Sequence, residues 1–206
     1  MYPITLDLKG KPVLIIGAGN VGERKIMSVY NAGAGVTVIS EQCSEPVKKL
    51  AREGKIRLTE RAYQPGVCRG YFMVIGSTDS NAVNAAISQE CTDLGILVNI
   101  VDQPEYSNFY VPAVVKRGDF QIAVSTEGKS PALVREIRKE LEEQYGEEYR
   151  HLTNRLGIIR KELKRKYSSD PAELSRQLQI AFQEEYTKFK ISQRLIRLSR
   201  KRNKTG

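Results

Sequence analysis

The chain has 206 residues, 40% of them hydrophobic, and a net charge of +9 from 33 Lys and Arg against 24 Asp and Glu. This length and composition predict one sizeable core with an appendage and exclude a largely disordered chain. No apolar run approaches the roughly 18 residues of a membrane span and residues 1–3 open no signal peptide, so we expect a soluble, cytoplasmic protein without membrane contact.

The cysteine and histidine content argues against several kinds of site. Cys43, Cys68 and Cys91 are far apart and odd in number, which predicts reduced thiols rather than a disulfide framework or a zinc site. His151 is the only histidine, so a His-rich metal centre is excluded and a Ser-His-Asp hydrolase is disfavoured. We therefore expect no metal site.

A glycine-rich turn follows the first apolar run, in the sequence VLIIGAGNVG of residues 13–22. Gly17 suits a tight strand-to-helix turn, Gly19 has no side chain to block a pyrophosphate, and Gly22 allows close helix packing. A helix over 23–32, stopped by Gly33, and a strand over 36–39 complete a βαβ unit. This context favours a dinucleotide site over a purely structural turn.

The alternation of strands and helices continues to residue 101. We expect a helix from 45 to about 53, capped by Ser44, and then a strand over 55–59 and a loop over 63–70. A strand over 71–75 follows. The next helix covers 80–94, capped by Asp79 and stopped by Gly95, and the last strand covers 96–101. Five strands with intervening helices or loops predict an α/β fold, a Rossmann domain with a parallel, doubly wound sheet.

The pattern changes after Asp102. Strands over 109–115 and 120–124 flank a turn at 116–119, and a helix begins at Ser130-Pro131, with Ser as N-cap, and runs to about 145. Residues 168–171 then separate two amphipathic helices. We expect a Rossmann domain over 1–113, a small β-β-α region over 114–146, too small to fold alone, and a basic helical domain over 147–206.

The excess positive charge lies in the last 56 residues. Residues 151–206 carry 15 Lys and Arg against 5 Asp and Glu, whereas residues 1–115 are balanced. Such a patch attracts polyanions, either nucleic acid, acidic lipid or a polycarboxylate substrate. For the final stretch, residues 200–204, a solvated helical face is the favoured interpretation.

Ligands of doubly wound sheets bind beyond the carboxyl ends of the strands. Besides the glycine loop, that rule selects residues 40–42, where Glu41 could bind the adenosine ribose although Ser40 occupies the more usual acidic position. No Arg adjoins it to hold a 2′-phosphate, so NAD is favoured over NADP. The rule also selects residues 76–79, where Thr78 and Asp79 serve either the cofactor or a helix cap.

The fourth place is the end of the fifth strand, residues 99–102. Asp102 follows an apolar strand and would reach the nicotinamide, where a partly desolvated carboxylate could act as a general base; a simple turn is the equal alternative. In the polar loop 125–131, Ser130 caps the next helix. Ser125 and Thr126 offer hydroxyl groups that could also bind substrate carboxylates, and Ser130 is the third candidate substrate-binding residue.

Together these stretches resemble a known family, the NAD-dependent precorrin-2 dehydrogenases, some of which are also sirohydrochlorin ferrochelatases. The family corresponds to the N-terminal part of multifunctional siroheme synthase. The matching stretches cover at least residues 1–145 in order, and they are Tyr2-Pro3-Ile4, residues 17–25 (GAGNVGERK), Thr78-Asp79, residues 99–102 (NIVD), Phe109 with Pro112, and the loop 125–131.

The resemblance implies a homodimer in which residues 114–146 form the dimerisation region. It implies NAD contacts from Asn20, Val21, Glu41 and Gln42. These add to the cofactor-binding residues already selected above, Gly17, Gly19, Gly22, Thr78 and Asp79. The resemblance also implies that Asp102 is the catalytic aspartate. The family's serine near the dehydrogenase site falls in the Ser125-Thr126 pair, where this chain has Thr at the second position. The chain has no room for the methyltransferase half of siroheme synthase.

The implied substrate, precorrin-2, carries eight carboxylates and is therefore a candidate ligand for the basic residues 151–206. We expect the chain to oxidise precorrin-2 to sirohydrochlorin in siroheme biosynthesis, with basic helices holding the tetrapyrrole. The absence of a His–carboxylate cluster favours dehydrogenase activity over additional ferrochelatase activity. One alternative is a Rossmann redox sensor whose basic tail binds nucleic acid, and such binding would be sensitive to salt. The tail has no clear helix-turn-helix, which counts against it. A second alternative is an NAD regulatory domain of the potassium-channel type. We expect no nucleic-acid partner.

Overall fold

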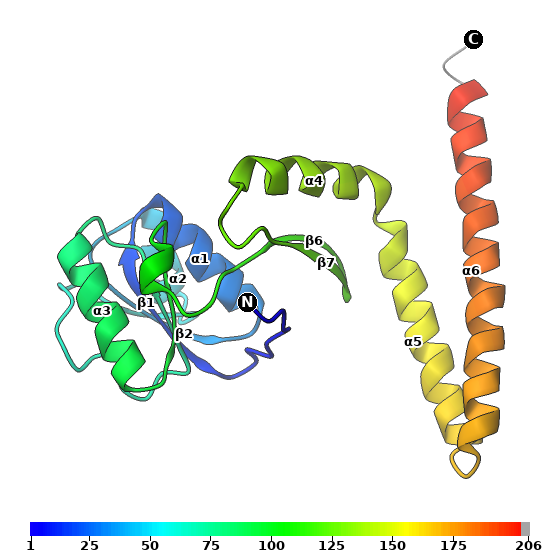
Figure 1. The fold of residues 1–206 in the computed structure, drawn as a ribbon, viewed down its shortest axis with the longest axis horizontal. Helices are drawn as coiled ribbons and strands as arrows, with labels where there is room; N and C mark the ends of the chain where they lie inside the picture. Colours follow the sequence, from blue (N-terminus) through cyan, green and yellow to red (C-terminus); the bar gives the residue numbers. More distant parts are fainter. Residues whose placement is uncertain (203–206) are drawn as a thin grey trace. The chain divides into compact units, whose positions relative to one another are not determined.

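The computed structural model describes the backbone of residues 1–202 and the side chains of residues 1–194. It divides the chain into two compact units, one over Met1–Val111 and one beginning at Pro112. The first unit contains β1 (Pro12–Ala18), α1 (Asn20–Asn31), β2 (Gly35–Cys43), α2 (Glu45–Arg52), β3 (Arg57–Thr59), β4 (Met73–Gly76), α3 (Asn81–Asp93), β5 (Leu97–Ile100) and the 3-10 turn η1 (Pro104–Tyr106). These elements are labelled in Figure 1 where there is room.

The first unit is built on a five-stranded sheet in the order β3-β2-β1-β4-β5, with every neighbouring pair parallel. The predicted doubly wound Rossmann fold is therefore confirmed. The chain adds β2 and then β3 on one side of β1, and then crosses back to add β4 and β5 on the other side. The order thus reverses between β1 and β4, and this is the point where such sheets bind ligands.

The central strand β1 is apolar throughout because both faces of the sheet are covered. On one face Val13 and Ile15 belong to a cluster that includes Ile26 of α1 and Val47 of α2. On the other face Leu14 and Ile16 belong to a cluster that includes Ile87 and Cys91 of α3, and also Cys68. All three cysteines are free thiols, as predicted.

The second strand is longer than the sequence indicated. β2 continues past Ile39 to Cys43, so residues 40–42 lie within the strand rather than after it. The register shows why: Ile16 pairs with Ile39 but Ala18 pairs with Cys43, which leaves Gly17 alone opposite three residues of β2. This bulge carries the polar residues Ser40, Glu41 and Gln42 to the carboxyl edge of the sheet.

One predicted helix cap is wrong, and a second is confirmed in position but makes a different hydrogen bond. Ser80, not Asp79, is the N-cap of α3, where its hydroxyl accepts a hydrogen bond from the Val83 N–H at 3.3 Å. Ser44 stands at the N-cap of α2 but donates its hydroxyl proton to the Glu23 carboxylate at 2.6 Å instead of capping. Asp79 and Ser80 have similar capping preferences and could not be separated from the sequence alone, whereas the contact between Ser44 and Glu23 forms only in the folded chain.

The observed cap predicts opposite behaviour for two adjacent residues. Ser80→Ala leaves the Val83 N–H without its partner and lowers the free energy of unfolding by about 1 kcal/mol. Asp79→Ala, at an exposed position, changes it by less than about 0.5 kcal/mol. Denaturant titration of both variants measures these free energies of unfolding. Equal decreases in the two variants would contradict the assignment of Ser80 as the N-cap of α3.

Side chains close the outer edge of β5. Asn108 accepts a hydrogen bond from the Val98 N–H at 2.8 Å and donates to the Ile96 carbonyl at 3.0 Å, so its amide imitates a neighbouring strand. The Ser107 hydroxyl accepts from the Ile100 N–H at 2.9 Å. The chain therefore reverses directly after β5, and Asp102 is held at the turn, while the edge of the sheet is protected from further pairing.

The second unit contains the antiparallel strands β6 (Ala113–Arg117) and β7 (Phe120–Val124), followed by α4 (Pro131–Gln144), α5 (Glu148–Lys166) and α6 (Pro171–Arg202). The predicted strand from residue 109 begins only at Ala113. The Ser130 hydroxyl accepts from the Leu133 N–H at 3.4 Å, which confirms it as the cap of α4. The predicted break at residues 168–171 is also confirmed, and α5 and α6 lie side by side (Figure 1).

One buried carboxylate joins α5 to α6. Glu185 of α6 is ion-paired with Arg155 of α5 and with Lys188 one turn further along α6, whose ammonium lies 3.0 Å from the carboxylate. The hydrogen bond from Lys188 and the charge of Arg155 hold the pKa of Glu185 below its usual value. Polar contacts therefore stabilise the packing of α5 against α6, in addition to apolar contacts. The expected solvated face at residues 200–204 lies outside the described side chains.

Candidate functional site

The glycine loop between β1 and α1 is shaped by two close backbone approaches. A Cβ on Gly22 would lie 2.3 Å from the Gly17 carbonyl oxygen, and one on Gly17 would lie 2.5 Å from the Ser77 carbonyl oxygen. Gly17 also has a φ of +95°, in the left-handed region that favours glycine. By contrast, a Cβ on Gly19 would meet no atom within 4 Å. Gly19 is thus open on the side that a ligand approaches.

The first turn of α1 follows this open glycine directly. Gly19 is the N-cap and has no side chain to satisfy the N–H groups of the first turn. Asn20 and Val21 are the first residues of the helix, with Asn20 exposed. A helix N-terminus of this kind attracts a phosphate through its N–H groups and its dipole, so the loop fits a dinucleotide pyrophosphate.

Two serine hydroxyls, one on each side of β1, hold the loop in this shape. The Ser77 hydroxyl, just after β4, donates to the Gly17 carbonyl at 2.8 Å. The Ser40 hydroxyl, on β2, accepts from the Ala18 N–H at 3.0 Å. Neither role was predicted from the sequence, and the only signal for either was that Ser40 stands where an acidic residue is more usual.

The other predicted cofactor residues divide into exposed and internally bonded side chains. Glu41 and Gln42 are exposed on the β2 bulge, and Asp79 is exposed after β4. Thr78 is half-buried, and its hydroxyl donates to the side-chain carbonyl of the buried Asn84 at 2.8 Å. Thr78 therefore orders the start of α3, while the exposed side chains remain accessible to a ligand.

Asp102 lies in the turn after β5 with a φ of +59°, a left-handed conformation that few non-glycine residues adopt. Such conformations gather at functional sites. The side chain is exposed rather than partly desolvated as expected. Its preceding residue Val101 packs against the core cluster that contains Ile26 of α1.

Lys25 of α1 is the charged neighbour of Asp102. The pKa of Lys25 is lowered, first by burial and then by Arg24, while the negative charge of Asp102 opposes that shift. A half-buried ammonium next to an exposed carboxylate makes this edge of the sheet a polarised site. In the sequence Lys25 is recognisable only as part of the stretch 17–25, and no local signal indicates its place beside Asp102.

In the second unit the loop 125–130 is ordered by its own hydroxyls. Ser125 accepts from the Glu127 N–H at 3.2 Å, and Thr126 accepts from the Ser130 N–H at 3.0 Å. Glu127 and Gly128 have positive φ angles, which turn the chain sharply into α4. Each hydroxyl that accepts a backbone bond still has a proton to donate, so Ser125 and Thr126 are suited to bind a carboxylate.

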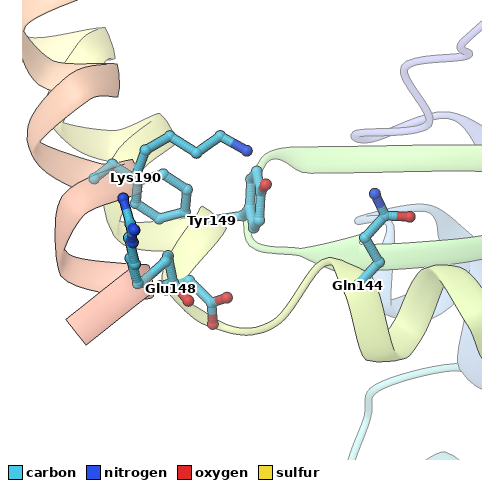
Figure 2. A pocket seen from close by; sticks show the side chains of 7 residues that line it. Gln144, Glu148, Tyr149 and Lys190 are labelled. Carbon is cyan, nitrogen blue, oxygen red and sulfur yellow. The ribbon is translucent and has the colours of Figure 1, made fainter. Parts of the chain in front are cut away.

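A cavity of about 150 Å³ lies elsewhere in the second unit, where the end of α4, the start of α5 and α6 come together (Figure 2). Lys190 reaches from α6 toward Tyr149 of α5, whose pKa is raised mainly by burial. Tyr149 also stacks on Phe120 and meets Phe189 edge-on, with ring centroids 5.1 and 5.0 Å apart. None of the predicted site residues lines this cavity, which belongs to the aromatic packing that joins β7 to the helices.

Among the described residues, no three His, Cys, Asp or Glu side chains lie close enough together to hold a metal ion. The helices in the same part of the chain are either too short or too polar to cross a membrane.

Comparison with known proteins follows the division of the fold. A family described as NAD(P)-binding, NAD_binding_7, matches residues 4–113, which include the whole Rossmann sheet. A second family, described as the central region of sirohaem biosynthesis proteins, matches residues 117–144, which include the loop 125–130 and the whole of α4.

Individual relatives agree with both matches. The siroheme synthase of Methylococcus capsulatus is 40% identical over 140 residues, and siroheme synthase 1 of Aeromonas salmonicida is 37% identical over 140 residues; the match covers 68% of this chain but only 30% of either synthase. Among solved structures, SirC, a precorrin-2 dehydrogenase, is 26% identical with a TM-score of 0.68 and covers 89% of this chain and all of its own. The match over more than half of its length, including the glycine loop, shows that the chain belongs to the NAD_binding_7 family of NAD(P)-binding proteins.

Proposed function

We propose that the protein oxidises precorrin-2 to sirohydrochlorin with NAD, in siroheme biosynthesis. The observation that carries the proposal is the likeness to a precorrin-2 dehydrogenase over the full length of that protein, which extends through the helical region as well as the Rossmann domain. The siroheme synthases match over 140 to 155 residues of this chain, and this likeness supports the same chemistry.

The cofactor lies at the switch point of the sheet in this proposal. The pyrophosphate binds over Gly19 at the N-terminus of α1, because no side chain obstructs that approach. Glu41 and Gln42 on the bulge bind the adenosine ribose, and Thr78 and Asp79 line the path toward the nicotinamide. NAD is preferred over NADP because Glu41 repels a 2′-phosphate and residues 40–44 contain no Arg or Lys to hold one.

Asp102 acts as the general base. NAD, when bound, accepts the hydride that leaves precorrin-2. The carboxylate of Asp102 takes the accompanying proton, so that the substrate loses one hydride and one proton and its conjugation is extended. The left-handed turn fixes the carboxylate at the carboxyl end of β5. Lys25 of α1 is its charged neighbour, and the negative charge of Asp102 opposes the lowering of the Lys25 pKa by burial.

The carboxylates of the tetrapyrrole are bound by hydroxyl groups and cations of the second unit. Ser125 and Thr126 each have a hydroxyl proton to donate, and the last 56 residues carry the whole excess of positive charge.

A homodimer completes the proposal. The two-stranded β6–β7 ribbon and α4 form too small a layer to bury an apolar face alone. Val114 of β6 and Leu133 of α4 are large apolar side chains that stay exposed in the single chain. A second copy of this region would cover them, and sedimentation at micromolar concentration would then give the mass of two chains.

Metal insertion is tested apart from oxidation. The protein is supplied with sirohydrochlorin and ferrous or cobaltous ion, and the appearance of the metallated product is compared with a protein-free control. Insertion faster than the control would add ferrochelatase activity to the proposal, and insertion at the control rate would limit the protein to the oxidation step.

A further inference from the structure

The bulge in β2 is held to the glycine loop by one side chain. Ser40 is half-buried, and its hydroxyl accepts from the Ala18 N–H at 3.0 Å while it donates to the Gln42 carbonyl at 2.7 Å. A single hydroxyl therefore bridges the phosphate-binding turn of β1 and the far end of the bulge. Both of its hydrogen-bonding roles are used in this way.

A second contact fixes the chain just beyond the bulge. The Ser44 hydroxyl donates to the carboxylate of Glu23 at 2.6 Å, and Glu23 lies in the first turn of α1. The exposed residues Glu41 and Gln42 thus lie between two anchored points, Ser40 and Ser44. Both anchors lead back to the same strand-to-helix junction that contains the glycine loop.

This arrangement accounts for a departure from the usual dinucleotide pattern. At the position where an acidic residue is more usual, the chain has Ser40, and the carboxylate follows one residue later in Glu41. Because three residues of β2 face Gly17 alone, the displaced carboxylate still reaches the carboxyl edge of the sheet. Its place there depends on the conformation of the bulge and not on the regular strand.

We propose that Ser40 is a positioning residue for the dinucleotide, which holds Glu41 on the bulge at a fixed place relative to the glycine loop. The pyrophosphate and the adenosine ribose are then recognised by one preorganised surface. Ser40 itself need not touch the cofactor. This inference rests on NAD(P) binding alone and goes beyond the reaction proposed above, so it does not depend on the identity of the substrate.

The test measures dissociation constants for NAD, NADP and nicotinamide mononucleotide with Ser40→Ala and with Ser28→Ala, an exposed serine of α1, as control. We expect Ser40→Ala to raise the dissociation constant for NAD by about tenfold, as the loss of two hydrogen bonds implies. The constant for NADP rises less, so the preference for NAD narrows, and nicotinamide mononucleotide, which has no adenosine ribose, binds as before. Ser28→Ala changes none of the three.

A double-mutant cycle separates positioning from general stability. If Ser40 acts through Glu41, the effect of Ser40→Ala on NAD binding shrinks in a Glu41→Ala background. Full additivity, or an equal loss of affinity for NAD and nicotinamide mononucleotide, would overturn the proposal. So would a lower melting temperature with unchanged NAD affinity. Should Ser40→Ala fail to fold, Ser40→Cys, which keeps a weak donor and acceptor, takes its place with the same criteria.

Discussion

Replacing Asp102 with asparagine lowers kcat for precorrin-2 oxidation by about 10²- to 10⁴-fold, the usual loss when a general base is removed. Asparagine is the appropriate substitution because it tolerates the left-handed conformation that Asp102 adopts, whereas alanine would add strain to the loss of the carboxylate. The dissociation constant for NAD stays within about twofold of the original. Steady-state kinetics and equilibrium binding together separate the two effects.

The matched control is Glu105→Gln, which removes an exposed carboxylate three residues further along the same loop. It leaves kcat unchanged, because Glu105 has no part in the proposed reaction. Full activity in Asp102→Asn would remove the general-base assignment. A loss of NAD binding equal to the loss of kcat would instead place Asp102 in cofactor binding.

The glycine loop yields the second large effect, in two variants that separate binding from folding. Gly19→Ala places a methyl group in open space, so the free energy of unfolding changes by less than about 0.5 kcal/mol while the dissociation constant for NAD rises at least about tenfold. Gly22→Ala places a methyl group 2.3 Å from a backbone oxygen and lowers the free energy of unfolding by about 1–3 kcal/mol.

Gly157→Ala in α5 is the control for both glycine variants. A Cβ there meets nothing within 4 Å, so alanine only improves helix propensity, by about 0.5–1 kcal/mol, and leaves NAD affinity unchanged. Denaturant titration and NAD binding on the three variants give a distinct pair of results for each. A Gly19→Ala protein that binds NAD normally would contradict the placement of the pyrophosphate.

The fold of the first unit could be predicted from the sequence because its signals are local. Apolar runs such as residues 13–16 and 73–75 are buried on both faces of a parallel sheet, and the glycine turn and helix stops punctuate them. The bulge of β2 could not be predicted, because it depends on pairing with β1 across the sheet. The predicted start of β6 at residue 109 was wrong because of contacts that also form only in the folded sheet. Residues 107–109 are hydrogen-bonded to β5 instead.

The site divides in the same way. The residue types at the carboxyl ends of the strands could be selected from the sequence, since glycine, aspartate and hydroxyl residues have local signatures there. The partners that hold them could not, because Ser40, Ser77 and Lys25 meet the loop and Asp102 only in the folded sheet. The exposure of Asp102 also could not be inferred from the apolar strand before it. Its surroundings are set by the turn and not by the strand.

The most direct test of the central claim is a single-turnover measurement with excess protein, precorrin-2 and NAD under anaerobic conditions, in which NADH and sirohydrochlorin are both quantified. We expect the two products to appear at the same rate and in equal amounts, and Asp102→Asn to suppress both. Sirohydrochlorin formation that is independent of NAD, or no NADH from a folded protein that binds NAD, would contradict it.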